Sequence, residues 1–516
     1  MNNVTRNRTS MPWFSNVLVI IRRRRRRRRR RRELSTLISH ILPQWLLTPK
    51  TNSTAPPPPI LPSNHSHGLL SLLLYHQPKR HPSLQVHAQL LTTALHHAAV
   101  LLWNTLLRHY SLGPSPQEAI HLYNQMQHLL ITTNSFTFSF LLKACANLSS
   151  LRQGSQLHGL VVKRGFESNV YVHTSLLDMY VCCRALVDAR KVFDEMPERN
   201  AVTWNVIITG MARHGEISMA WALFQQMPER NAIAWTGMID GYTRARRPVE
   251  ALSLLVQMLA EGVSPTEVTI LAVVPAISTV GALGFGESMH AFCDKNGIGL
   301  LDVRVENSFI DMYAKCGSID SSMKVFERMS WRRNLVSWTS VISAFAMHGM
   351  ASEAVGLLKE MKQDNVRPNR VTFLSVLNAC SHGGLVEEGM RFFSSMVYEY
   401  GIEPEIKHFG CMIDMLGRAG RLWEAEKLIG DLPGEVNVIV WRTLLGCCSK
   451  HGDVEMGERV MRRILEMEKG YGGDYVILSN MLSEAGRFGD AEGIRRLMDE
   501  RHALKVPGLS LVAGKD

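Results

Sequence analysis

Five tryptophans of this chain stand in nearly the same local sequence. Trp103, Trp204, Trp235, Trp338 and Trp441 occur in LLWNTLL, VTWNVII, IAWTGMI, VSWTSVI and IVWRTLL. An alanine follows each of the first four 16 residues later, and a methionine follows 23 residues later: Ala119, Ala220, Ala251 and Ala354, then Met126, Met227, Met258 and Met361. Spacing preserved in this way is typical of a repeat protein, which stacks copies of one small unit.

Each repeated unit is predicted to form two helices. In residues 201–231 a first apolar stripe has helical spacing and is ended by Gly215; it consists of Trp204, Ile207, Ile208 and Met211. A second stripe precedes Pro228; it consists of Ile217, Ala220, Leu223, Phe224 and Met227. The small Ala220 side chain lets the two helices approach closely. Because neither helix can bury its stripe alone, we expect an all-α solenoid with the Trp and Met residues in its core.

The lengths of the units vary in an ordered way. Ten units are expected at 100–134, 135–169, 170–200, 201–231, 232–266, 267–302, 303–334, 335–369, 370–405 and 406–437. They contain 31 to 36 residues, and the lengths cycle through 35, 35–36 and 31–32. A constant length of about 34 residues would instead indicate a protein-binding tetratricopeptide array.

Charge is distributed unevenly along the chain. Residues 1–117 contain 17 of the 58 basic residues and one of the 46 acidic residues, Glu33. Residues 118–516 therefore have 41 basic and 45 acidic residues, a net charge of −4 against +16 for the N-terminal part. Any binding of nucleic acid by the repeats must depend on the local placement of groups, because general attraction to phosphates is absent.

Residues 1–63 have the composition of an organelle transit peptide followed by a Pro-rich linker. The segment is nearly free of acids, rich in Arg, Ser, Thr and Asn, and contains the arginine run Arg22 to Arg32. We expect it to be disordered and cleaved on import into mitochondria, with chloroplasts as the alternative. The arginine run is also typical of a nuclear signal or a nucleic-acid-binding tail.

Two classes of protein are disfavoured by composition. No apolar run approaches the roughly 18 residues that a membrane span needs. The nine cysteines are an odd number and none has C-x-x-C spacing. A disulfide framework or a four-thiolate zinc site is therefore not expected, and a reducing compartment is favoured.

The units resemble the pentatricopeptide repeat family, and specifically its plant subclass of alternating P, L and S motifs. The resemblance is carried by SLLDMYVCCRALVDARKVFDEMPERN (175–200), SFIDMYAKCGSIDSSMKVFERM (308–329) and SFLLKACANLSSLRQGSQLHGLVVKRG (139–165). It implies a right-handed superhelix. A degenerate L-type repeat is expected at 64–99. Residues 438–505 resemble the two E motifs that end this subclass, and a tail follows at 506–516.

The resemblance implies binding of single-stranded RNA, with one nucleotide per repeat and the RNA running 5′ to 3′ from the N- to the C-terminus. Two residues of each repeat would read the base: the one after the aromatic residue in the first helix, and the last residue of the repeat. An Asn amide can donate to the ring nitrogen of C or A, whereas an Asp carboxylate only accepts and suits U or G. This rule applies to the last residue of the repeat. At the other position, after the aromatic residue, a short Thr leaves room for a purine and a longer Asn reaches a pyrimidine.

These rules assign bases to six repeats. C, with U tolerated, is expected for Asn104 with Asn134, Asn205 with Asn231, and Asn307 with Asn334; A is expected for Thr174 with Asn200 and for Thr339 with Asn369. The pair Thr236 and Thr266 departs from the usual combinations and leaves its base open, a purine being the nearest expectation. Poor reading is expected for Ser139 with Asn169, Leu271 with Asp302, Leu374 with Glu405, and Gly410 with Asn437. The alternative for any single Asn is a helix cap at the junction of two units.

The sequence predicts no enzyme activity, no metal and no cofactor. A zinc-dependent cytidine deaminase needs H-x-E and C-x-x-C. The one H-x-E, His214-Gly215-Glu216, lies at a predicted turn, and C-x-x-C is absent. The chain stops at PGLSLVAGKD directly after the E motifs, so no deaminase domain is expected.

The resemblance favours a factor that chooses a site for C-to-U RNA editing in a plant organelle. Its E motifs would recruit a deaminase-bearing protein of the same family and other editing factors in trans, and no membrane partner is expected. The expected target is 5′-C-n-A-C-n-n-C-A-n-n-n-n-n-C-3′, with the last C edited. Two alternatives stay open: RNA splicing, stabilisation or translation without editing, and a protein-binding helical scaffold.

Overall fold

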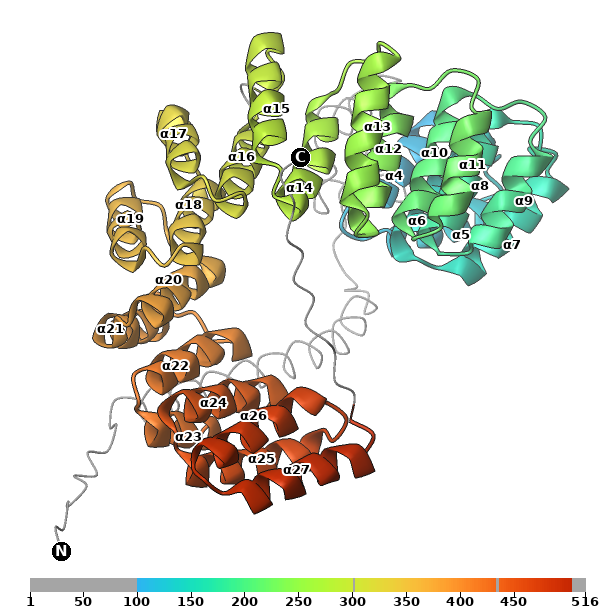
Figure 1. Cartoon of the computed structure of the whole chain (residues 1–516). Coiled ribbons are helices and arrows are strands. Elements are labelled where there is room, and N and C mark those ends of the chain that lie inside the picture. Colours follow the sequence, from blue (N-terminus) through green and yellow to red (C-terminus); the bar gives the residue numbers. More distant parts are fainter. Residues whose placement is uncertain (1–99, 300–301, 433–435, 504–516) are drawn as a thin grey trace, which may run out of the picture. The chain divides into compact units, whose positions relative to one another are not determined.

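The computed structural model describes residues 100–299, 302–432 and 436–503, and every regular element in these ranges is a helix (Figure 1). The presequence, linker and degenerate repeat predicted for residues 1–99 lie outside the described residues, as does the tail predicted for 506–516. The chain divides into two compact units, and the division falls between Ser308 and Phe309 within α16 (Val303–Lys315). None of the described helices is long and apolar enough to cross a membrane.

The unit that ends at Ser308 is a succession of helical hairpins. Its helices are α4 (Val100–Leu112), α5 (Gln117–His128), α6 (Ser135–Leu148), α7 (Leu151–Lys163), α8 (Val170–Cys182), α9 (Leu186–Glu195), α10 (Ala201–Arg213), α11 (Ile217–Gln226), α12 (Ala232–Arg244), α13 (Pro248–Ala260), α14 (Glu267–Val280) and α15 (Leu283–Asn296), before the start of α16.

The unit that begins at Phe309 continues the same pattern. After α16 its helices are α17 (Ile319–Met329), the short η2 (Ser330–Arg332), α18 (Leu335–Met347), α19 (Ala351–Gln363), α20 (Arg370–Gly383), α21 (Val386–Tyr398), α22 (Ile406–Arg418), α23 (Leu422–Gly430), α24 (Val438–His451), α25 (Val454–Met467), α26 (Gly472–Glu484) and α27 (Phe488–Glu500). The even-numbered helices from α4 to α24 begin at residues 100, 135, 170, 201, 232, 267, 303, 335, 370, 406 and 438, where the sequence analysis places the starts of the repeats and of the E-motif region.

The prediction of an all-α solenoid is confirmed, because from α4 to α15 and from α18 to α27 the first helices pack against one another in succession and against the second helices that follow them. The first helix α10 contacts its own partner α11 and also the first helices of the adjacent repeats, α8 and α12. Gly215 has a positive φ of 91° at the turn between α10 and α11, a conformation that costs glycine little. Ala220 is fully buried at this hairpin, as expected for a close approach of two helices.

The recurring tryptophans lie in the core, with one exception. Trp103, Trp204, Trp235 and Trp338 are buried, and so are the methionines at the ends of the second helices. Trp441, in the region that resembles the E motifs, is only half-buried. The Trp and Met stripes therefore supply packing between the repeats, as the sequence predicts.

An arginine anchors the junction that leads out of three of the short repeats, 170–200, 201–231 and 303–334. Arg199 Nε donates to the carbonyl oxygen of Phe193 at 3.0 Å, and its guanidinium lies 4.8 Å from the centre of the Phe193 ring. That ring meets Trp204 of the next helix edge-on, with 4.8 Å between the ring centres. The same arrangement recurs for Arg230 with Phe224 and Trp235, and for Arg333 with Phe326 and Trp338. Each arginine thus satisfies a carbonyl at the end of one helix and positions the residue after it, an Asn, at the start of the next.

Candidate nucleic-acid interface

The last residue of each predicted reading pair is the N-cap of the next first helix. The Oδ1 atom of Asn200 accepts from Thr203 N at 2.9 Å, and that of Asn369 accepts from Thr372 N at 2.9 Å. Asn134, Asn231, Asn334 and Thr266 cap α6, α12, α18 and α14 in the same way. These side chains therefore do cap the next first helices, as the helix-cap alternative expects. Capping, however, uses only the oxygen of an Asn. Its NH2 group stays available as a donor.

The two predicted reading residues of the first repeat are bonded to each other. Asn104 Nδ2 donates to Asn134 Oδ1 at 2.9 Å, and Asn104 Oδ1 accepts from the hydroxyl of Thr137 at 2.7 Å. Because capping makes Asn134 Oδ1 an acceptor, Asn104 must turn its NH2 group toward it and its oxygen toward Thr137. Each amide then has one or more N–H groups left for a ligand, and both present donors. Two donors suit the acceptor-bearing edge of cytosine.

The threonine pairs are joined through a third residue. Thr236 Oγ1 lies 2.7 Å from Thr269 Oγ1, which is 3.2 Å from Thr266 Oγ1. Two further chains of the same kind run from Thr339 through Thr372 to Asn369 and from Thr174 through Thr203 to Asn200. The structure thus brings these predicted partners together around one shared hydroxyl.

Two predicted reading side chains have an unsatisfied atom. The Oδ1 atoms of Asn205 and Asn307 are buried and have no hydrogen-bond partner among the described residues. Asn205 belongs to the same unit as Asn231, yet Asn231 Oδ1 is occupied by the backbone N–H groups of Ile233 and Ala234. Asn307 and Asn334 belong to one predicted repeat, 303–334, but to different compact units of the chain.

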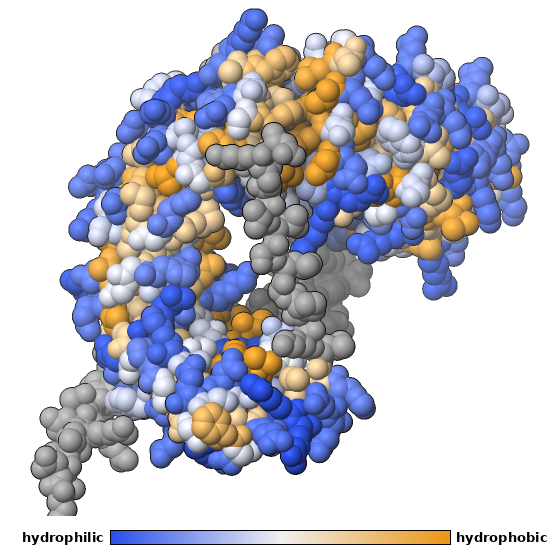
Figure 2. All heavy atoms as spheres, in the orientation of Figure 1, coloured by the Kyte–Doolittle hydropathy of each residue, from blue (hydrophilic) through white to orange (hydrophobic). Residues whose placement is uncertain are grey.

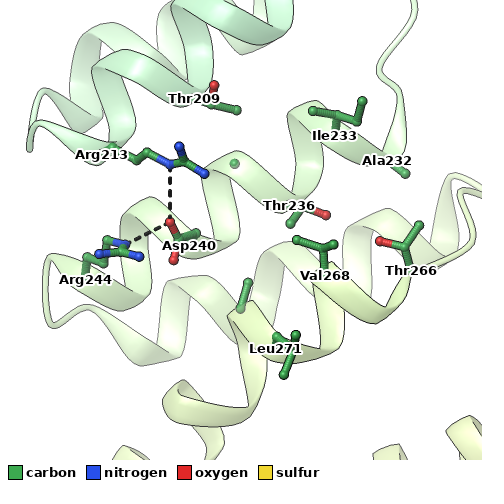
Figure 3. Close-up of a pocket in the computed structure, with 12 residues that line it drawn as sticks. Thr209, Arg213, Ala232, Ile233, Thr236, Asp240, Arg244, Thr266, Val268 and Leu271 are labelled. Carbon is green, nitrogen blue, oxygen red and sulfur yellow. Dashed lines mark hydrogen bonds and ion pairs between the residues drawn. The ribbon is translucent and has the colours of Figure 1, made fainter. Parts of the chain in front are cut away.

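A cavity of about 510 Å³ opens beside one reading pair (Figure 3). Thr236 and Thr266 lie on its wall, and Ile233 and Val268, the second residues of α12 and α14, lie beside them. The cavity therefore combines hydroxyl groups that can bond to the edge of a flat ring with apolar side chains that can contact its faces. This is the chemistry that a single unpaired nucleobase requires.

The apolar residue at the second position of the first helices recurs along the chain. Its exposed fraction is 61% for Ile233 and 59% for Val268, unusually high for side chains of this kind. Exposed apolar residues also occupy this position in other repeats: Leu101, Phe136, Tyr171, Val202, Val336, Val371 and Ile439. Apolar patches are visible over α14 and its neighbours in the space-filling view (Figure 2). These residues were not predicted from the sequence, although an apolar residue recurs at the second position of nine first helices.

Basic groups beside the cavity are partly neutralised. Asp240 Oδ2 lies 2.8 Å from Arg244 Nε and 3.8 Å from Arg213 Nε (Figure 3). The side chains of both arginines are about two-thirds exposed, and Asp240 is more buried. The arginines could contact phosphates, but the carboxylate between them reduces the attraction.

The H-x-E triplet lies at the turn between α10 and α11. His214 is half-buried and Glu216 exposed at the turn between α10 and α11. Within residues 100–299, 302–432 and 436–503 there is no group of three or more His, Cys, Asp and Glu side chains placed to hold a metal ion. The nine cysteines, all in these ranges, are free thiols.

Sequence comparison finds known families along most of the described chain. The PPR repeat family matches residues 98–147, 199–233 and 333–382, and the pentatricopeptide repeat domain matches 158–213. The PPR repeat matches 233–263, 307–333, 371–399 and 408–435. The E motif matches 451–513.

Similar proteins carry the same repeats. A mitochondrial pentatricopeptide repeat-containing protein of Arabidopsis thaliana is 52% identical over 427 residues, which are 80% of this chain and 85% of the relative. A chloroplastic one from the same plant is 37% identical over 83% of this chain and 65% of the relative. Among solved structures, the pentatricopeptide repeat protein PPR10 in complex with an 18-nt psaJ RNA element is 16% identical, covers 86% of this chain and 79% of its own, and has a TM-score of 0.36.

Proposed function

Because the chain belongs to the pentatricopeptide repeat family, we propose that it binds a specific single-stranded RNA in a plant organelle and selects a cytidine for C-to-U editing. The observation that carries the RNA-binding part is the geometry at Asn104 and Asn134. Both side-chain oxygens accept hydrogen bonds from Thr137, and one N–H of Asn104 is donated to Asn134, so the remaining N–H groups of the two amides are available to donate to a ligand. A pair of donors beside an exposed apolar residue suits the edge and face of one base.

The proposed target follows from the order of the repeats. From α4 to α22 the pairs specify 5′-C-n-A-C-n-n-C-A-n-n-n-n-n-C-3′, where U is tolerated in place of each read C. We infer that the hydroxyl chain at Thr236 and Thr266 leaves the fifth nucleotide weakly specified. Affinity for this RNA should exceed that for a scrambled RNA of the same composition, because correct pairing supplies several hydrogen bonds that the scrambled RNA lacks.

The RNA-binding proposal is tested by measuring the affinity of the purified protein for these two RNAs in one buffer of stated salt concentration. Preference for the proposed target supports it. Equal affinity for both would contradict it and would favour the protein-binding scaffold.

For the editing function, we propose that the E-motif helices recruit a deaminase-bearing protein in trans. A cavity of about 490 Å³ lies among α25, α26 and α27 and is lined by apolar residues together with Arg462, Arg487 and Asp490. The last helix, α27, has a single fully buried residue, Ala491, while Ile494 and Leu497 are half-buried. A partly covered apolar face of this kind supports a protein contact at the E motif.

Depletion of the protein followed by sequencing of organellar transcripts tests the editing proposal. Loss of editing at one or a few cytidines with unchanged transcript abundance supports it. A change in splicing, abundance or translation with normal editing would favour the alternative of RNA processing without editing.

We also propose a mitochondrial location, supported by the 52% identical relative named as mitochondrial. A fusion of residues 1–70 to a fluorescent protein should enter mitochondria, and entry into chloroplasts would contradict this.

A further inference from the structure

The third residue of the first helices has a hydroxyl group in some repeats and lacks one in others: it is Thr137, Thr203, Thr269, Ser337 or Thr372 in the first group and Val172, Ala234, Val305, His408 or Val440 in the second. Where it is threonine, its Oγ1 atom lies 2.7 to 3.2 Å from a polar atom of the reading side chain in the preceding repeat. These four pairs are Asn104 with Thr137, Thr174 with Thr203, Thr236 with Thr269, and Thr339 with Thr372. We call this group the third-position hydroxyl.

Two repeats show what happens without it. Ala234 and Val172 occupy the third position after Asn205 and Ser139. The Oδ1 atom of Asn205 and the Oγ atom of Ser139 are buried and have no partner among the described residues. A threonine at the third position therefore satisfies the polar atom of the preceding reading side chain, and Ala234 and Val172 leave that atom without a partner. Asn307, whose third-position residue is Ser337, also has an Oδ1 atom without a partner among the described residues.

The hydroxyl also determines which end of an Asn faces the ligand. At Asn104 the oxygen is held by Thr137 and one N–H by Asn134, so only N–H is left to present. Such a side chain matches the ring-nitrogen acceptor of cytosine and opposes the N–H at the same position of uracil. Asn205 has no hydroxyl to hold its oxygen. A half-turn of its amide exchanges oxygen and nitrogen, so it can accept from uracil as readily as it donates to cytosine.

We propose that the third-position hydroxyl is a specificity-determining positioning group, and that its replacement by Ala234 makes the repeat at 201–231 discriminate poorly between C and U. This inference rests on the proposed RNA-binding function. It adds a residue outside the reading pair, located in the next repeat, that sets how strictly the pair is read.

The test compares C with U at two nucleotides of the proposed target: the first, which faces Asn104, and the fourth, which faces Asn205. The full chain should prefer C about fivefold or more at the first nucleotide, as expected for one hydrogen bond gained or lost. At the fourth nucleotide the preference should be less than about twofold.

Substitutions at the third position should exchange these preferences. Ala234→Thr should raise the preference for C at the fourth nucleotide to about fivefold, and Ala234→Val, which has the same shape without the hydroxyl, should not. Thr137→Val should reduce the preference at the first nucleotide, and Thr137→Ser should retain it. Threonine and valine both occupy this position in other repeats, so the variants suit the fold; thermal unfolding checks this.

The results separate this inference from the proposed function. If the parent chain prefers C at the first nucleotide but Thr137→Val and Ala234→Thr leave both preferences unchanged, the positioning role is wrong and RNA reading stands. A preference for C that rises equally in Ala234→Thr and Ala234→Val would assign the effect to packing and overturn the role of the hydroxyl. A parent chain that binds all of these RNAs equally would contradict both proposals.

Discussion

The side-chain amide of Asn104 donates a hydrogen bond of 2.9 Å to Asn134, a residue 30 positions later in the chain. Asn134 in turn caps α6 through Thr137 N. One carbonyl oxygen thus serves both the local start of a helix and the contact between the two reading residues. The stability of the repeat junction and the presentation of the amide groups are therefore coupled, and a substitution that keeps the cap can change the ligand preference alone.

Asn369→Asp should change the base preference of the repeat at 335–369 from A to G. Asn369 caps α20 by accepting from Thr372 N, and an Asp can accept the same bond with equal strength. The change replaces the free NH2 donor by a second acceptor oxygen, which suits the N–H of guanine. Binding to RNAs that differ only at the eighth nucleotide should show A favoured by the parent and G by the variant, with about 1–3 kcal/mol lost on the original A.

Asn437→Asp is the matched control for this substitution. Asn437 caps α24 by accepting from Ile439 N at 3.0 Å, but its expected partner, Gly410, has no side chain. The control should leave every base preference unchanged. If the two variants behave alike, the effect of Asn369→Asp comes from added charge and the reading assignment is wrong.

Asp240→Asn should strengthen RNA binding and make it more dependent on salt. The carboxylate of Asp240 lies 2.8 Å from Arg244 Nε and 3.8 Å from Arg213 Nε, and its removal frees two cations at the cavity of Figure 3. Each additional phosphate contact should steepen the slope of log affinity against log salt by about 0.7. Affinities measured at several salt concentrations give this slope.

Asp194→Asn controls for net charge. Asp194 makes a bond of 2.8 Å to Arg190 on α9, a second helix without any reading residue. Its removal changes the charge by the same amount, so a slope that steepens equally in both variants would place the phosphate contacts elsewhere.

Much of the fold could be predicted from the sequence because the packing residues recur. Trp204, Ala220 and Met227 mark two helices and their contact, and Gly215 marks the turn between them. The roles of the reading residues could be predicted only in part. Asn134 fits both a cap and a reader, and only the geometry shows that its oxygen caps α6 and accepts from Asn104, which leaves its nitrogen for the proposed contact with a base.

The remaining features depend on contacts between repeats. Thr137 looks like an ordinary capping residue in the sequence, and its bond to Asn104, 33 residues earlier, is visible only in the folded stack. The same is true of Ala234, which is unremarkable until its neighbour Asn205 is found with an unsatisfied oxygen. Ile233 lies outside the apolar stripe of its helix, and only its recurrence at the second position of other first helices distinguishes it in the sequence.

The stability of the repeats should fall as pH rises above 9, because buried thiols resist ionisation. Burial raises the pKa of Cys145, Cys293, Cys380 and Cys448 from 9.0 to about 12. Between these values the unfolded chain loses protons that the folded chain keeps, so the free energy of unfolding decreases with pH. Each thiol contributes about 1.4 kcal/mol per pH unit. Urea unfolding under reducing conditions at pH 8 to 11 measures this slope.

The Cys380→Ala variant measures how much the Cys380 thiol contributes to the loss of stability above pH 9. The variant should be less stable at neutral pH because a buried group is removed, but its stability should decline less steeply above pH 9. Parallel slopes for parent and variant would assign the decline to other groups, such as lysines and tyrosines.

Ile233→Ser should weaken RNA binding without destabilising the protein. The side chain is 61% exposed beside the cavity lined by Thr236, so its loss removes little buried area on folding but an apolar contact with the bound base. Affinity for the proposed target should fall on the order of fivefold, equivalent to about 1 kcal/mol of apolar contact. The control is Val249→Ser in the second helix α13, where the side chain is 62% exposed and does not line the cavity. Thermal unfolding should match the parent for both variants, and RNA affinity should fall only for Ile233→Ser. Equal affinities for the two variants would show that the bases do not contact the exposed apolar residues of the first helices.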